Sequence, residues 1–173
     1  GNTPQLQYVV QQTVSTETDV DQVLAGELDL MAKVVEGAKI EKAKADPNVS
    51  THSYLRNGYG MIAMPVDFGP TKDANVRWAL ACLIDRSAVI DYVLGGYGGT
   101  VDAEYGLAQW TYQEKAAELA EELKPMTFNI DVANDYLDQS DYKYEADGTT
   151  PFDRTKANAD GSYMRYNSAG EML

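Results

Sequence analysis

The stretch DANVRWALACLIDRSAVIDYVLGG, residues 73–96, decides the fold prediction because its apolar residues recur at the spacing of a helix. The recurring residues are Val76, Ala79, Leu80, Leu83, Ile84, Ile90, Val93 and Leu94. Asp73 precedes them as an N-cap, and Gly95 follows them as the left-handed residue that commonly ends a helix. We therefore predict one framework helix, capped at Asp73 and stopped at Gly95, that buries a single broad apolar stripe.

The same stretch holds the chain's single cysteine and an Asp-Arg pair, which raises the question of an active site. A reactive Cys82 needs a partner that lowers its pKa; His52 is the single histidine, and no third group orients the two. Asp85 and Arg86 are adjacent, so on a helix they point about 100° apart and predict salt bridges to other elements or caps of loop backbone. We therefore predict no catalytic residue, and a small buried hydrophobe at Cys82.

Strands are predicted on the N-terminal side of this helix. QLQYVVQQTV (5–14) is rich in β-branched and aromatic residues, and ELDL (27–30) alternates as a strand does. A short helix that starts near Asp19 and ends at Gly26 lies between them, and such a crossover favours a parallel pair. With a solvated helix at EGAKIEKAKADPN (36–48), the sequence predicts an α/β fold, a mixed sheet with packed helices.

Two segments leave alternatives open. VSTHSYLRNGYGMIAMP (49–65) holds two extended runs around Asn57-Gly58, and either an ordinary hairpin or a strand that passes between two lobes explains it. VDAEYGLAQWTY (101–112) carries aromatic residues either as buried anchors or as ligand contacts. The glycines of GGYGGT (95–100) follow a helix rather than a strand, so they predict a helix stop and a loop, not a phosphate cradle.

Composition excludes several classes of function. The chain of 173 residues has 27 acidic and 14 basic side chains, and its net charge of −13 would repel nucleic acid and anionic membranes. With one His and one Cys there is no zinc-ligand spacing, and the calcium-loop pattern fails when it is centred on Gly161. No apolar run is long enough to span a membrane, and no signal peptide occupies residues 1–10. The sequence therefore predicts a globular domain without a metal, a cofactor or a catalytic site.

Several segments together resemble the family 5 extracellular solute-binding proteins, the oligopeptide- and dipeptide-binding components of bacterial ABC importers. In chain order they are VLAGELDL (23–30), YLRNGYGMIAMP (54–65), the stretch 73–98, YGLAQW (105–110) and FNIDVANDYLDQSDYKYEADGT (128–149). The most specific is 73–98, which is similar to the family's Asp-x-x-Val-Arg-x-Ala-Leu followed by Ile-Asp-Arg. The last departs from the family, because Ser140 and Asp141 replace a small Ala-Gly pair.

The resemblance implies a partial lobe of a type II periplasmic-binding-protein-like fold. The receptor would close two lobes on a peptide-like solute and present it to the membrane permease subunits of an ABC importer. Residues 1–53 would be the end of the first lobe, 54–64 a hinge-crossing strand, and 65–173 the first part of the second lobe, incomplete at its C-terminus. The location would be extracytoplasmic, as a cell-surface lipoprotein or in the periplasm. The candidate ligand contacts are Tyr54, Arg56, Asn57, Tyr59, Tyr105 and Trp110.

Further expectations concern the ligand and the extent of the chain. The resemblance allows a peptide, a sugar oligomer or a metal chelate. The family's acidic residue that pairs with the amino terminus of a peptide would lie beyond Leu173. We therefore expect a fragment that binds no peptide tightly by itself and that self-associates through exposed sheet edges. Two other classes of function are a carboxylate-dependent extracellular hydrolase and a surface interaction module without a small ligand.

Overall fold

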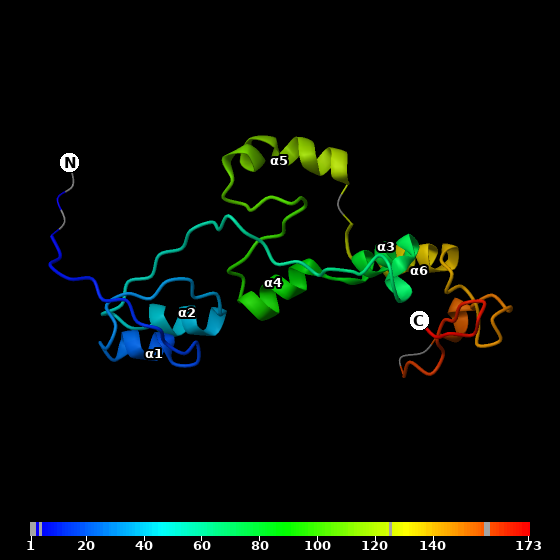
Figure 1. Ribbon diagram of the computed structural model, residues 1–173, viewed down its shortest axis with the longest axis horizontal. Helices are drawn as coiled ribbons and strands as arrows, with labels where there is room; N and C mark the ends of the chain where they lie inside the picture. The colour runs from blue at the N-terminus through cyan, green and yellow to red at the C-terminus, as the bar shows by residue number, and fades with distance from the viewer. Residues whose placement is uncertain (1–2, 4, 125, 158–159) are drawn as a thin grey trace. The chain divides into compact units, whose positions relative to one another are not determined.

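The computed structural model describes residue 3 and residues 5–124, 126–157 and 160–173. In this part of the chain there are six α-helices, two 3₁₀ turns and three isolated antiparallel bridges. The α-helices are labelled in Figure 1. The helices are α1 (Asp19–Leu24), α2 (Gly37–Lys44), α3 (Ala74–Leu83), α4 (Arg86–Leu94), α5 (Trp110–Leu123) and α6 (Ile130–Gln139). The 3₁₀ turns are η1 (Pro70–Lys72) and η2 (Arg154–Lys156), and the bridges pair Tyr144 with Pro151 and Tyr166, and Tyr166 with Met172.

The chain divides into two compact units. The first comprises Gly1–Tyr54 and Asp91–Gly98, and the second Leu55–Ile90 and Gly99–Leu173. One boundary between the units falls within α4, and another falls at the start of the predicted crossing segment 54–64. A compact unit is not by itself a lobe of a receptor, so the predicted division into 1–53, 54–64 and 65–173 stays a prediction.

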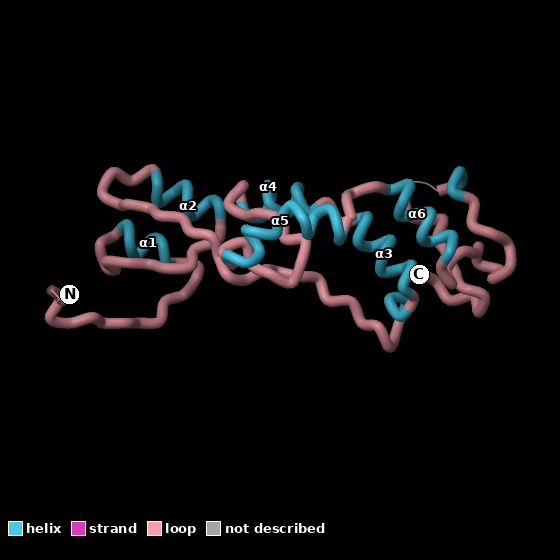
Figure 2. Tube along the Cα trace, turned by 90° about the horizontal axis from the view of Figure 1, so that it is seen from above, coloured by secondary structure: helices cyan, strands magenta, loops and turns pink. Residues whose placement is uncertain are grey.

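The α/β prediction, a mixed sheet with packed helices in a partial lobe of a type II periplasmic-binding-protein-like fold, is wrong. The described residues form helices and loops without a sheet (Figure 2). The runs 5–14, 27–30 and 49–65 are not strands, and in the first of them Val9 and Val10 are 84% and 85% exposed. Side-chain preference favours extended backbone, whereas a strand also needs N–H and C=O partners on another segment. No described segment supplies these partners, so the predicted parallel pair of 5–14 and 27–30 is not formed.

In the first unit, α1 and α2 are joined by lysines of α2. The Lys39 ammonium contacts the backbone carbonyl of Thr16 and lies 3.2 Å from the buried carboxylate of Asp19. Lys42 pairs with Asp21 in the first turn of α1. The helix predicted over 36–48 is confirmed in type, although it ends at Lys44.

The helix predicted over 73–95 is two helices, because the chain leaves the helical conformation at Ile84 (φ −93°, ψ 108°). The Asp85 carboxylate then accepts hydrogen bonds from the backbone N–H groups of Ser87 and Ala88, both at 3.0 Å, and so caps α4. Asp85 therefore caps backbone N–H groups, although they belong to a helix and not to a loop as predicted. The predicted stop after Leu94 is confirmed, and Gly95 has φ +59°.

The core of the second unit lies between α3 and α6, which pack side by side (Figures 1 and 2). Ala79, Cys82 and Ala133 are each 1% exposed, and Met126, Tyr136 and Leu137 pack against them. The helices are antiparallel, because the Asn129 N–H before α6 donates to the Cys82 carbonyl near the end of α3 at 2.8 Å. The predicted stripe is therefore buried on α3 at Val76 and Ala79, whereas Leu83 at the end of α3 is 41% exposed and Val93 on α4 is 66% exposed.

Asp73 connects the other ends of these two helices. Its Oδ1 accepts the N–H of Asn75 at 2.8 Å, and its Oδ2 accepts the N–H of Asp141 at 2.7 Å. Asp73→Ala removes both bonds and is expected to lower the free energy of unfolding by about 1–2 kcal/mol. Asp73→Ser, which keeps a capping oxygen on a shorter side chain, is expected to lose less. Urea unfolding followed by circular dichroism measures both variants, and an alanine variant as stable as the natural chain would contradict this role.

Candidate ligand-binding site

The six predicted ligand contacts all have exposed side chains. Tyr54 is 74% exposed and is the last residue before the chain enters the second unit. The other five belong to the second unit and lie on two segments, 56–59 and 105–110. Tyr105 and Trp110 are 47% and 69% exposed, so the alternative of buried aromatic anchors is wrong.

The segments 56–58 and 106–108 are in direct backbone contact. Gly106 is buried, and a Cβ atom added to it would lie 2.6 Å from the Gly58 nitrogen and 2.7 Å from the Asn57 carbonyl carbon. The Ala108 N–H donates to the Arg56 carbonyl at 3.4 Å. The structure thus brings Arg56 and Asn57 to the loop that carries Tyr105, a pairing that the sequence did not predict. The hairpin alternative is wrong, because the two runs on either side of Asn57-Gly58 do not pair with each other.

The loop before α5 is also anchored at its beginning. Arg86, the first residue of α4, donates to the Val101 carbonyl at 3.0 Å and pairs with the Asp102 carboxylate at 2.8 Å. The predicted salt bridge of Arg86 to another element is therefore confirmed. The loop is thus held at 101–102 and at 106–108, and Tyr105, which lies between these two anchors, is 47% exposed.

A shallow hollow of about 240 Å³ adjoins this loop. It is lined by Tyr105, Thr111, Tyr112, Lys115 and Leu119. Tyr112 is the buried aromatic residue of the region, at 9% exposure, and it was not singled out in the sequence. The signal that could have found it is an aromatic residue in the first turn of α5, and Tyr112 lines the same hollow as Tyr105.

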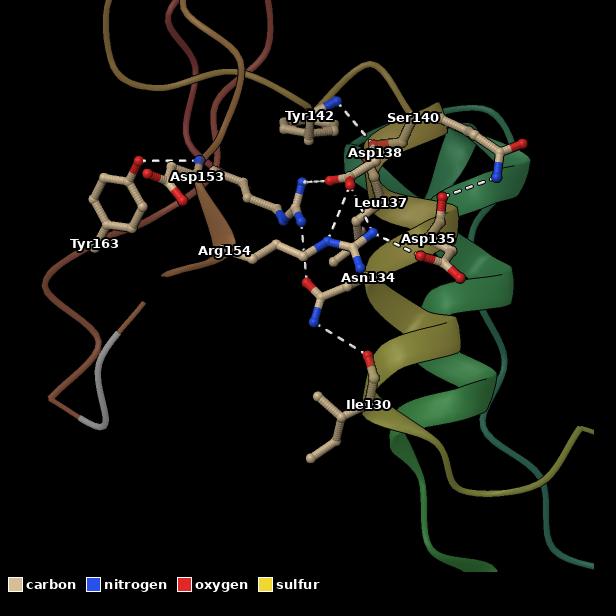
Figure 3. A network of polar contacts seen from close by, with 12 residues as sticks. Ile130, Asn134, Asp135, Leu137, Asp138, Ser140, Tyr142, Asp153, Arg154 and Tyr163 are labelled. Carbon is tan, nitrogen blue, oxygen red and sulfur yellow. Dashed lines mark hydrogen bonds and ion pairs between the residues drawn. The ribbon is translucent and has the colours of Figure 1, made fainter. Parts of the chain in front are cut away.

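A second polar cluster lies where the C-terminal segment meets α6 (Figure 3). Arg154 pairs with Asp135 at 2.8 Å and with Asp138 at 2.6 Å. Arg165, which is 5% exposed, pairs with Asp138 at 2.8 Å and donates to Asn134 at 3.0 Å. Each guanidinium is thus neutralised by carboxylates of α6, and we assign this cluster a structural role.

The pKa shifts also have structural causes. The Tyr163 hydroxyl, at 2.6 Å, and then Lys156 lower the pKa of Glu145. Hydrogen bonds from the Thr150 hydroxyl and from backbone N–H groups of the same turn lower the pKa of Asp147 to about 2. Burial raises the pKa of the Cys82 thiol, whose sulfur contacts Met126 at 3.7 Å. None of these groups lies on the segments that carry the candidate contacts.

Among the described residues, no group of three or more His, Cys, Asp or Glu side chains is placed to hold a metal ion. In the same part of the chain, none of the helices has both the length and the apolar character needed to cross a bilayer.

Comparison with known proteins gives one match. The family model for bacterial extracellular solute-binding proteins, family 5 middle, matches residues 1–169. No curated protein and no solved structure matches the chain significantly.

The contact at Gly106 predicts an effect of Gly106→Ala. The added methyl group cannot fit against the backbone of Asn57 and Gly58, so the two segments are expected to separate, at a cost of about 1–3 kcal/mol. Faster hydrogen exchange at Ala108 would report the separation. Gly60→Ala is the matched control, because a Cβ on Gly60 meets no atom within 4 Å. Unchanged exchange in Gly106→Ala would contradict the contact.

The burial of Cys82 predicts an inert thiol. At mildly alkaline pH, a soluble disulfide reagent is expected to label the folded chain slowly and the urea-unfolded chain fast, because the folded thiol is 1% exposed and its pKa is raised. The signal is unambiguous, since the chain has a single cysteine. Equally fast labelling of both states would restore the hypothesis of a reactive cysteine.

Proposed function

The chain belongs to the family 5 bacterial extracellular solute-binding proteins. We propose that it forms part of a receptor that captures oligopeptides for uptake. Members of this family bind solutes outside the cytoplasm for ABC transporters, and they are generally transport receptors rather than enzymes. The peptide ligand, anchoring as a lipoprotein, and docking to particular permease subunits are parts of the proposal.

The observation that carries the proposal is the contact of segments 56–58 and 106–108. It brings together the two segments that carry the exposed side chains of Arg56, Asn57, Tyr59 and Tyr105. Peptide recognition needs flat aromatic surface and hydrogen-bonding groups rather than a nucleophile or a metal. These side chains supply both, which supports a ligand site at this place.

The hydrolase alternative has less support. Hydrolysis by paired carboxylates needs one of them to keep a raised pKa. Asp135 and Asp138, two carboxylates that share Arg154, are instead paired with arginines. Glu145 and Asp147, in the same region, have lowered pKa values.

The proposal is tested by isothermal titration of the natural protein that carries this chain with a pool of random tetrapeptides. Affinities in the micromolar range or better are expected, and Tyr59→Ala combined with Tyr105→Ala is expected to weaken them about tenfold or more, because stacking area is lost. Tyr92→Ala is the control, since Tyr92 is 89% exposed and lies in the other unit. Binding of sugar oligomers but not of peptides would overturn the peptide ligand.

A further inference from the structure

Asn57 is the one asparagine of the chain that a glycine follows. Glycine has no Cβ, so no side chain on residue 58 shields the backbone nitrogen next to the Asn57 side chain. An unshielded nitrogen at this place can attack the side-chain amide of the asparagine before it. The dipeptide Asn57-Gly58 is therefore a candidate for spontaneous modification.

The side chain of Asn57 is free to react. It is exposed and makes no hydrogen bond to any residue that the structure describes. Asn48 is the other described asparagine with an exposed and unbonded side chain, but Val49 follows it, and a β-branched residue shields its own backbone nitrogen. The asparagines whose side chains are held by hydrogen bonds are Asn75, Asn129, Asn134 and Asn167.

The backbone nitrogen of Gly58 is also unused, since its N–H donates to no acceptor in the described part of the chain. The pair Asp147-Gly148 shows the opposite arrangement. There the glycine N–H donates to the Glu145 carbonyl at 3.0 Å. The Asp147 carboxylate accepts bonds from the backbone N–H and the hydroxyl of Thr150. Both reacting groups are thus available at Asn57-Gly58 and occupied at Asp147-Gly148.

The reaction needs water as its only co-reactant. The Gly58 nitrogen attacks the side-chain carbonyl carbon of Asn57 and closes a cyclic imide, and the side-chain nitrogen leaves as ammonia with the proton that Gly58 gives up. Water then breaks one of the two carbonyl bonds to the imide nitrogen. Cleavage at the side-chain carbonyl gives aspartate in a normal backbone. Cleavage at the main-chain carbonyl gives isoaspartate, whose backbone runs through the side-chain carbons.

The two products differ in their effect on the contact at Gly106. Aspartate keeps the main chain and adds one negative charge at an exposed position. Isoaspartate adds one atom to the main chain between the Cα of residue 57 and Gly58. A Cβ on Gly106 would already lie 2.6 to 2.8 Å from main-chain atoms of Asn57 and Gly58. A contact this close has no room for a further main-chain atom.

We infer that Asn57 is a site of spontaneous deamidation, and that its isoaspartate form separates the segment 56–58 from the segment 106–108. The aspartate form keeps the two segments together. The inference stands on the chemistry of the dipeptide and on a backbone contact, so it does not depend on which solute the receptor binds.

The test incubates the natural protein that carries this chain, in its folded state, at mildly alkaline pH. Mass spectrometry of proteolytic peptides measures the conversion of each asparagine, and a protease that cleaves before aspartate but not before isoaspartate distinguishes the products. Asn57 is expected to convert about tenfold faster than Asn48 or more, because valine shields the nitrogen that glycine leaves open. Conversion of Asn57 no faster than that of Asn48 would overturn the modification site.

Gly58→Ala tests which nitrogen attacks. Gly58 has no left-handed φ, and an added Cβ would lie 3.0 Å from the Nε of Arg56, a flexible side chain that can move away, so the variant is expected to fold. Conversion of Asn57 is expected to slow about fivefold or more, because the methyl group shields the nitrogen. Gly60→Ala is the control, since its Cβ meets no atom within 4 Å. Equal conversion in Gly58→Ala and Gly60→Ala would contradict attack by the Gly58 nitrogen.

Hydrogen exchange at Ala108, whose N–H donates to the Arg56 carbonyl, measures the separation of the two segments. Exchange is expected to be about tenfold faster or more in the isoaspartate fraction, because this bond is lost. Asn57→Asp, which has the charge without the extra main-chain atom, is expected to exchange like the natural chain. Unchanged exchange in the isoaspartate fraction would overturn the separation. Equally fast exchange in Asn57→Asp would assign the effect to charge and overturn the role of the extra atom.

Discussion

The second unit depends on the close antiparallel packing of α3 against α6. Ala79 and Ala133 are almost fully buried, and only small side chains at these positions let the two backbones come close. The bonds at the two ends, Asp73 to Asp141 and Asn129 to Cys82, require that separation, because a hydrogen bond tolerates little change in length. The C-terminal segment depends in turn on this pair, since its two arginines bind carboxylates of α6.

The candidate ligand site follows from a different kind of contact. The loop that carries Tyr105 is held by Arg86 at one end and by the backbone of Arg56 and Asn57 at the other. No side chain of the site is used to hold the loop in place. The aromatic rings therefore stay exposed, whereas Tyr112 provides the buried aromatic contact at the start of α5.

Local signals in the sequence were enough to predict most helices and caps. The helix caps made by Asp73 and Asp85 and the turn at Gly95 lie within one or two turns of those residues, so these roles could be inferred from neighbouring residues. The bond from the Asp141 N–H to Asp73 is not local and could not be inferred in this way. The break at Ile84 was missed because an apolar residue there fits the helical spacing, although Asp85 is itself a cap signal. The strands were predicted wrongly because pairing is not local: residues 5–14 have strand-like side chains and no partner in the described part of the chain. The six site residues remain predictions. The contact of Gly106 with Asn57 and Gly58 could not be predicted, because a glycine in a loop has many possible causes.

The backbone pairing at Gly106 has a consequence for how such a receptor changes during evolution. The contact is made by main-chain atoms and by the absence of a Cβ at Gly106. Mutations at Arg56, Asn57, Tyr59 or Tyr105 would therefore change the proposed solute contacts without altering this contact. Selection can then act on these positions one at a time. Gly106 is the exception, since every replacement adds atoms to the contact, and we expect relatives that transport different solutes to keep this glycine.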